Sequence, residues 1–184
     1  RALFNTAKAE GQRTLELRLL AAFNRLGMTP PGDSKVSIQD LPDASPATLA
    51  WIGSEMLESD PTLSQLAIDR VLFDHPESLA VPDALETKAK IAYNAGDFSD
   101  AVSVLDTISD RYPTWPKAPE IALRSAGILL ESKRTEDALA RYLEILQIRD
   151  WRGTAWAEAC YKIGRCYEAT DDTLKAHGFY ERTY

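Results

Sequence analysis

Ala92 to Pro113 reads AYNAGDFSDAVSVLDTISDRYP, and two later segments of the chain repeat its pattern of small and bulky residues. Ala101 aligns with Ala138 and then with Ala176, at separations of 37 and 38 residues. Two further columns agree, with bulky residues at Leu105, Tyr142 and Tyr180 and small residues at Ala89, Ala126 and Gly164. A self-similar period of roughly 20 to 50 residues is typical of a stacked-repeat protein.

This repeat predicts an all-α fold, a right-handed α-solenoid of stacked antiparallel helix hairpins. Two antiparallel helices pack closely only where one of them offers a small residue at the crossing. A single hairpin cannot bury both of its faces, so neighbouring hairpins must stack on each other. No segment alternates apolar and polar residues for long, so we expect no strands.

The array is expected to follow an N-terminal helix over residues 1–27 and a Pro/Gly-rich connection over 28–44. It then occupies residues 45–184, in copies of about 45–80, 81–115, 116–150 and 151–184. Ser45 with Pro46, and Asp60 with Pro61, are helix starts, because a side-chain oxygen can cap the free amides and proline suits the first position. The later hairpin turns are expected at Gly96, at Lys133 with Arg134, and at Asp171.

The composition of the chain limits the class of molecule that it is expected to bind. The formal net charge is -7 and the pI is about 4.9, which argues against a nucleic acid because phosphate binding needs clustered Lys and Arg. No run of about 18 apolar residues occurs, so we expect no membrane span within this chain. The chain begins with Arg1, and we expect it to be part of a longer protein, so the compartment stays open.

No catalytic, metal or cofactor motif is present, and we expect a protein that is not an enzyme. The two histidines, His75 and His177, fall in different hairpins without a matching nucleophile, and His75 is expected to be a junction residue. Cys160 and Cys166 lie six residues apart on one expected helix, about 9 Å along its axis, too far for a disulfide. We expect both to be free thiols in the core. Trp115 and Trp151, which fall between copies, are expected to cover the junctions.

The small residue of the first helix, the GDFSDA turn at 96–101 and the closing Tyr112 and Pro113 resemble the tetratricopeptide repeat (TPR) family. The resemblance covers residues 45–184, with a period longer than the family's usual 34 residues. The segment RYPTWPKAPEIA between copies is similar to bacterial cell-envelope members with long repeats. What the resemblance implies is a non-catalytic scaffold that binds a protein segment in the concave groove formed by the first helix of each hairpin.

Carried onto this sequence, the resemblance implies a groove with a line of basic residues and neighbouring aromatic rings. The candidate groove residues are Lys90, Tyr93, Asn94, Arg124, Tyr161, Lys162 and Arg165, with Glu86, Leu123, Leu130 and Glu168 beside them. Such a line could hold an acidic or aromatic-rich segment. The alternative is that these cations are solvated and pair with neighbouring Glu and Asp.

Three other expectations follow. The chain could be a structural or assembly component of a bacterial cell-envelope complex, or the substrate-recruiting part of a larger enzyme. The cell-envelope resemblance points to the periplasm or, for a lipoprotein, the outer membrane, with the cytoplasm as the other option. The last helix, which ends at Tyr184, lacks a polar capping helix, so we expect its apolar face to be covered by continuing chain or by self-association.

Overall fold

The structure is a computed structural model that describes residues 44–151 and 153–183. The expected N-terminal helix and the connection lie outside the described residues, apart from Ala44. Within the described ranges every regular element is a helix and there is no strand, so the predicted all-α fold is confirmed.

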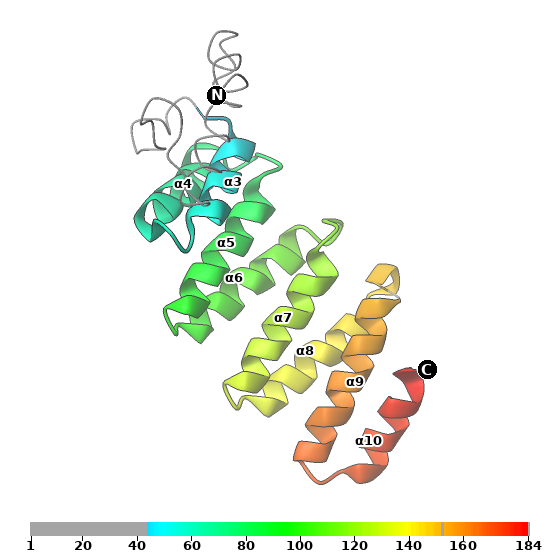
Figure 1. Ribbon diagram of the computed structural model, residues 1–184. Coiled ribbons are helices and arrows are strands. Elements are labelled where there is room, and N and C mark those ends of the chain that lie inside the picture. Colours follow the sequence, from blue (N-terminus) through cyan, green and yellow to red (C-terminus); the bar gives the residue numbers. More distant parts are fainter. Residues whose placement is uncertain (1–43, 152, 184) are drawn as a thin grey trace, which may run out of the picture. The chain divides into compact units, whose positions relative to one another are not determined.

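Eight α-helices and two short 3-10 helices follow one another along the described chain (Figure 1). The α-helices are α3 (Pro46–Met56), α4 (Pro61–Asp74), α5 (Val81–Asn94), α6 (Phe98–Arg111), α7 (Ala118–Glu131), α8 (Thr135–Gln147), α9 (Thr154–Ala169) and α10 (Thr173–Tyr180). The 3-10 helices are η2 (Arg149–Trp151) and η3 (Glu181–Thr183). Two α-helices fall within each of the four ranges that the repeat suggested.

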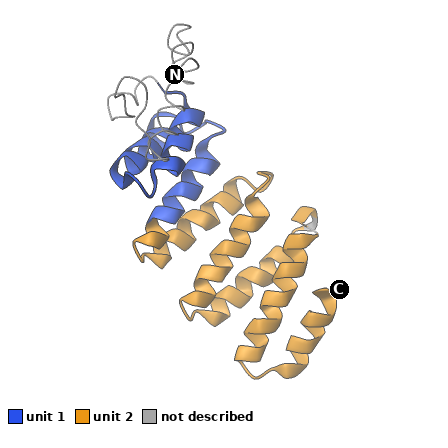
Figure 2. Ribbon diagram, viewed as in Figure 1, with its two compact units in different colours: residues 1–91 blue, residues 92–184 orange. Residues whose placement is uncertain are grey.

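The chain divides into two compact units, residues 1–91 and residues 92–184, and the boundary falls inside α5 (Figure 2). In the first unit, α3 and α4 pack together as a hairpin. In the second unit, each helix from α6 to α10 packs on the next one, and α7 also contacts α9. Successive hairpins therefore stack in the second unit as the repeat requires.

Helix starts use the capping chemistry expected from the sequence. The Ser45 hydroxyl accepts a hydrogen bond from the Thr48 amide at 3.3 Å, and Asp60 accepts one from the Leu63 amide at 3.0 Å. A proline follows each cap at the start of the helix, where its missing N–H costs no hydrogen bond. The first hairpin therefore begins and turns where predicted.

The later turns keep one backbone conformation although their sequences differ. Gly96, Lys133 and Asp171 have φ angles of 80°, 61° and 59°, in the left-handed region. They are spaced by the repeat period, and only the first is a glycine, the residue that adopts this region without a steric penalty. The other two turns therefore hold an L-residue in a conformation that costs about 1 kcal/mol.

The junctions between hairpins also repeat. His75 and Tyr112 both cap the end of a helix, and their amides donate to the carbonyls of Val71 and Ile108. His75 is thus a junction residue, as predicted. Trp151 is 6% exposed, and its indole Nε1 donates to the Pro113 carbonyl at 3.2 Å. The expectation that this tryptophan covers a junction is confirmed.

The small residues lie at the helix crossings of the second unit. Ala101 and Ala138 are fully buried, and Ala176 is 3% exposed. A Cβ atom added to Gly164 would lie 2.3 Å from the Tyr180 ring, so glycine makes room for the bulky residue of the same hairpin. Small and bulky columns therefore face each other here.

The first hairpin contains a crossing of the same kind. A Cβ atom on Gly53 would lie 2.3 Å from Cδ1 of Ile68, and the Ser64 hydroxyl donates to the Gly53 carbonyl at 2.6 Å. Gly53 is not among the small residues of the columns predicted from the sequence.

Candidate binding groove

Two neighbouring hollows lie along α7 and α9 in the second unit, and together we call them the α7–α9 groove. The first, of about 370 Å³, is lined by Tyr93, Glu120, Leu123, Arg124, Gly127, Ile128, Glu131, Tyr142, Glu158 and Lys162. The second, of about 380 Å³, is lined by Pro116, Pro119, Glu120, Leu123, Asp150, Trp151, Thr154, Ala155 and Glu158. The hollows share Glu120, Leu123 and Glu158, so one continuous surface connects them.

The repeat places charges of like sign on the two helices at matching positions. Glu158 follows Glu120 by one period, and we call these two carboxylates the acidic row. Lys162 follows Arg124 by the same period, and we call these two cations the basic row. The rows are separated by four residues along each helix, or about 6 Å. Because α7 and α9 contact each other, each row spans both helices.

The four row residues do not neutralise one another. Glu120 with Arg124, and Glu158 with Lys162, have the i, i+4 spacing and the order that favour an ion pair. Yet within the described part of the chain neither pair lies within 4.0 Å, although Lys90 and Glu86 at the same spacing form an ion pair of 2.6 Å. The groove therefore presents charges that are available to a ligand.

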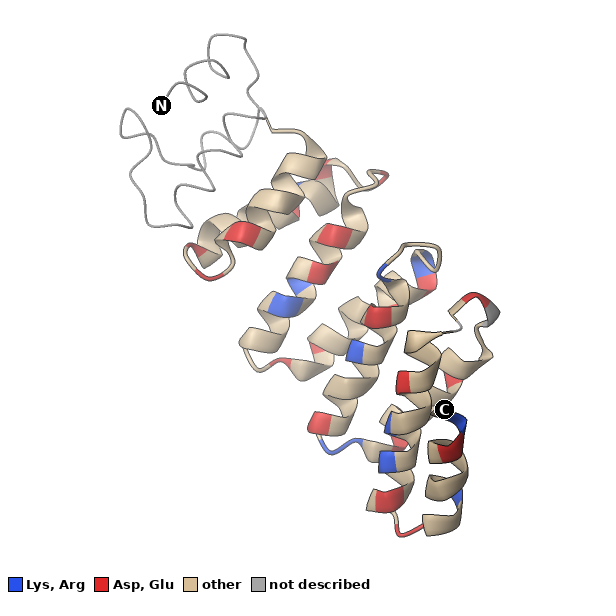
Figure 3. Ribbon diagram, turned by 45° about the vertical axis from the view of Figure 1, so that its right-hand side comes forward, with Lys and Arg blue, Asp and Glu red and all other residues tan. Residues whose placement is uncertain are grey.

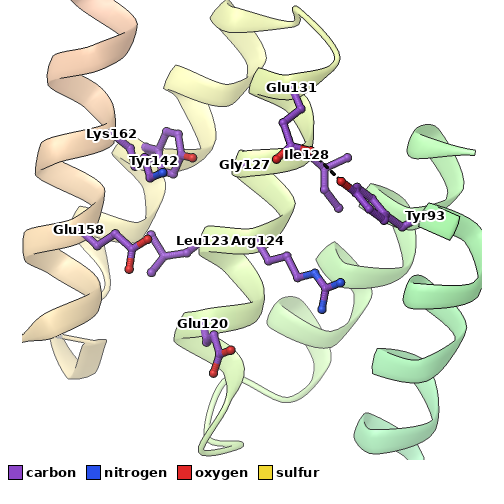
Figure 4. Close-up of a pocket in the computed structure, with 10 residues that line it drawn as sticks. All are labelled: Tyr93, Glu120, Leu123, Arg124, Gly127, Ile128, Glu131, Tyr142, Glu158 and Lys162. Carbon is purple, nitrogen blue, oxygen red and sulfur yellow. Dashed lines mark hydrogen bonds between the residues drawn. The ribbon is translucent and has the colours of Figure 1, made fainter. Parts of the chain in front are cut away.

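Figure 4 shows how these side chains are directed. Glu158 and Lys162 project from α9 toward α7, while Arg124 projects from α7 toward the side on which Tyr93 lies. The Tyr93 hydroxyl donates a hydrogen bond to the Glu131 carboxylate at 3.0 Å, and this carboxylate raises the pKa of Tyr93. Glu131 is thus engaged by a tyrosine at the end of the first hollow.

Apolar side chains also line the two hollows, beside the acidic row and the basic row. Leu123 is half-buried and lines both hollows. Tyr142 is 1% exposed, and burial raises the pKa of its hydroxyl. Trp151 and Pro119 extend the apolar surface into the second hollow. A ligand could therefore bury apolar atoms here while its charges meet the two rows.

The structure separates the candidate residues by position. Tyr93, Arg124 and Lys162 come together around the first hollow. Lys90 belongs to the first unit and pairs with Glu86, and Asn94 is exposed at the end of α5 without lining either hollow.

The remaining two candidates lie on α9 outside the lining of both hollows. Tyr161 is 45% exposed, and its ring centroid lies 5.8 Å from that of Tyr180. Arg165 is exposed, and its Nε lies 3.6 Å from the Glu168 carboxylate. A hydrogen bond with the Tyr161 side chain raises the pKa of Arg165. These contacts show Arg165 paired with its own helix neighbours.

Carboxylates are the lining residues that sequence reasoning missed. Glu120, Glu158 and Asp150 line the groove, but attention to the cations alone passed over them. The signal was available, because Glu120 and Glu158 have the same separation as Arg124 and Lys162. In the second unit, α7 and α9 each carry both acidic and basic residues (Figure 3).

Two further features of the described residues are their possible metal ligands and their cysteines. Residues 44–151 and 153–183 contain no group of three or more His, Cys, Asp or Glu that could hold a metal ion. Cys160 and Cys166 are buried free thiols, as predicted, and burial raises the pKa of each. No helix in the described part is both long and apolar enough to cross a bilayer.

No protein-family model and no curated protein matches the sequence. Solved structures do share the fold. The MamA protein has 13% identity and a TM-score of 0.64, with 94% of this chain and 91% of that chain covered. A kinesin light chain with nearly identical TPR-like repeats from Podospora anserina has 12% identity and a TM-score of 0.60, covering 99% and 90%. BtubC (BKLC) from P. vanneervenii has 15% identity and a TM-score of 0.58, covering 98% and 75%.

At these identities the likeness concerns the fold, and it extends over nearly the whole chain. The structure has consecutive helix hairpins with small residues at their crossings, and its structural neighbours share this fold. The chain therefore has the TPR-like α-solenoid fold.

Proposed function

We propose that this chain is a non-catalytic protein-interaction scaffold that binds a protein segment in the α7–α9 groove. The observation that carries the proposal is the set of four row residues around the half-buried Leu123, which form no ion pair within the described residues. Hollows of this size match those that hold ligands in other proteins, roughly 300 to 1,000 Å³. A TPR-like fold is itself consistent with protein partners.

The chemistry of the lining suits the binding of a protein segment. No cysteine, histidine or serine is among the described residues that line the two hollows. The carboxylates, cations and apolar side chains of the groove instead offer the mixture of anchors found at protein interfaces.

The alternatives raised from the sequence are compatible with this proposal. Assembly of a cell-envelope complex, or recruitment of substrate to a larger enzyme, would each require capture of a protein segment. Self-association through the last helix also stays a prediction, to which the 87% exposed Leu174 of α10 lends some support.

A peptide-display selection tests the proposed function. Random peptides are selected on the wild-type chain, and the enriched ones are then measured on Leu123→Glu. We expect this substitution to reduce binding at least about tenfold, or about 1.4 kcal/mol, since it places a carboxylate where apolar atoms of the peptide would be buried. Leu139→Glu is the matched control, because Leu139 is also half-buried but lies on α8 outside the groove.

Equal binding of the enriched peptides to the wild type and to Leu123→Glu would contradict the proposal. Circular dichroism of both variants shows whether the fold is retained.

A further inference from the structure

We infer that the α7–α9 groove recognises a segment with one basic and one acidic residue at a fixed spacing, rather than a uniformly acidic segment. This inference rests on the proposed function and specifies the chemistry of the partner. It follows from the order of the two rows along α7 and α9. The acidic row places carboxylates on both helices, and the basic row, one helical turn later, places cations on both.

The acidic row is suited to a lysine or arginine side chain of the bound segment. Glu120, Glu158 and Asp150 line the second hollow, and none of the described residues that line it is a Lys or Arg. Pro119 and Trp151 supply apolar surface there. Long cationic side chains bury their aliphatic stems on apolar surface while the charged head meets carboxylates. A guest cation would therefore find both contacts in one hollow.

The basic row is suited to a carboxylate of the bound segment. Arg124 and Lys162 line the first hollow and lie in no ion pair within the described residues. Three carboxylates also line this hollow: Glu131 already accepts a hydrogen bond from Tyr93, and Glu120 and Glu158 form the acidic row. A guest Asp or Glu could therefore form charge-assisted hydrogen bonds with either cation.

The separation of the rows sets the spacing of the guest charges. Four residues of α-helix rise about 6 Å, and two residues of an extended segment span about 6.6 Å. The guest charges should therefore lie two residues apart in an extended segment or four apart in a helix. An apolar side chain between them would lie over Leu123, which lines both hollows.

A row-swapped variant tests this inference directly. It carries Glu120→Lys, Glu158→Lys, Arg124→Glu and Lys162→Glu, so two charges of each sign are exchanged and the net charge of the chain is unchanged. Non-specific electrostatic attraction is thereby held constant. The probe is one random peptide-display library with capped ends, selected in parallel on the wild-type and row-swapped chains, and circular dichroism confirms that both are folded.

We expect the wild type to enrich peptides with opposite charges at one of the two spacings and in one order. The row-swapped chain should enrich the reverse order and bind the wild-type peptides at least about tenfold more weakly. Enrichment of uniformly acidic peptides by the wild type, or of the same peptides by both chains, would overturn the inference while leaving groove binding intact. If neither chain enriches any peptide, the proposed function itself fails.

Discussion

Gly53 offers a test of the helix crossings, because substitution by alanine should have opposite effects in two backgrounds. A Cβ at this position would lie 2.3 Å from Cδ1 and 2.6 Å from Cγ1 of Ile68. Ile68 is fully buried, so its side chain has no open space to move into. Gly53→Ala should therefore strain the α3–α4 crossing in the wild type.

The magnitude follows from two opposing terms. Alanine favours a helix interior over glycine by about 1 kcal/mol, whereas overpacking of a filled core costs about 1 to 3 kcal/mol. We expect a net loss of up to about 2 kcal/mol in the free energy of unfolding. Ile68→Ala alone should cost about 2 to 5 kcal/mol. Because that change removes both clashing atoms, adding Gly53→Ala should then restore about 1 kcal/mol.

Urea denaturation of the wild type, the two single variants and the double variant measures this coupling, with circular dichroism as the signal. Gly178→Ala in α10 is the matched control, since nothing lies within 4 Å of an added Cβ there. It should stabilise through helix propensity alone, by about 1 kcal/mol. If Gly53→Ala stabilises the wild type as Gly178→Ala does, the close crossing at Gly53 is refuted.

Three further predictions concern the second unit, and urea denaturation checks all of them. Lys133→Gly should stabilise the chain by up to about 1 kcal/mol, because glycine adopts the left-handed turn conformation without steric cost; a loss of stability would contradict that turn. Trp151→Phe should cost about 1 kcal/mol, because the Pro113 carbonyl loses its indole donor; no change would mean that this bond is unimportant. Asp106→Ala should cost about 1 to 3 kcal/mol, since the buried Ser125 hydroxyl loses the acceptor to which it donates at 2.7 Å and Arg141 loses its ion-pair partner; a neutral result would mean that another group takes the place of Asp106.

Much of the fold could be predicted because the repeat period carries information that single residues lack. Lys133 and Asp171 are unusual residues for a left-handed turn. They were nevertheless assigned to turns, since each follows Gly96 by a whole number of periods. Helix starts at Ser45 and Asp60 were predicted from capping chemistry, which depends only on neighbouring residues.

Gly53 was missed for a physical reason. The first copy shares few residue types with the later ones, so its small residue formed no obvious column. The contact that requires glycine depends on the position of Ile68 on the opposite helix. A one-dimensional alignment does not show how close those two backbones come.

The candidate groove was only partly accessible from the sequence. The period relates Arg124 to Lys162, and both line the first hollow. It equally relates Glu120 to Glu158, but these two carboxylates were not part of the predicted line of basic residues. Whether an i, i+4 pair closes or stays open depends on side-chain conformations. The structure was therefore needed to show that the row residues form no ion pair within the described part of the chain.

The most direct test of the account is to map a bound peptide on the chain by NMR chemical-shift perturbation. A peptide enriched on the wild type is titrated into the isotopically labelled protein. We predict that the shifted amides concentrate around residues 119–124 of α7 and 155–162 of α9, on the two sides of the groove. Perturbations that centre instead on the ion pair of Asp106 and Arg141, between α6 and α8, or that spread evenly over the chain, would contradict the account.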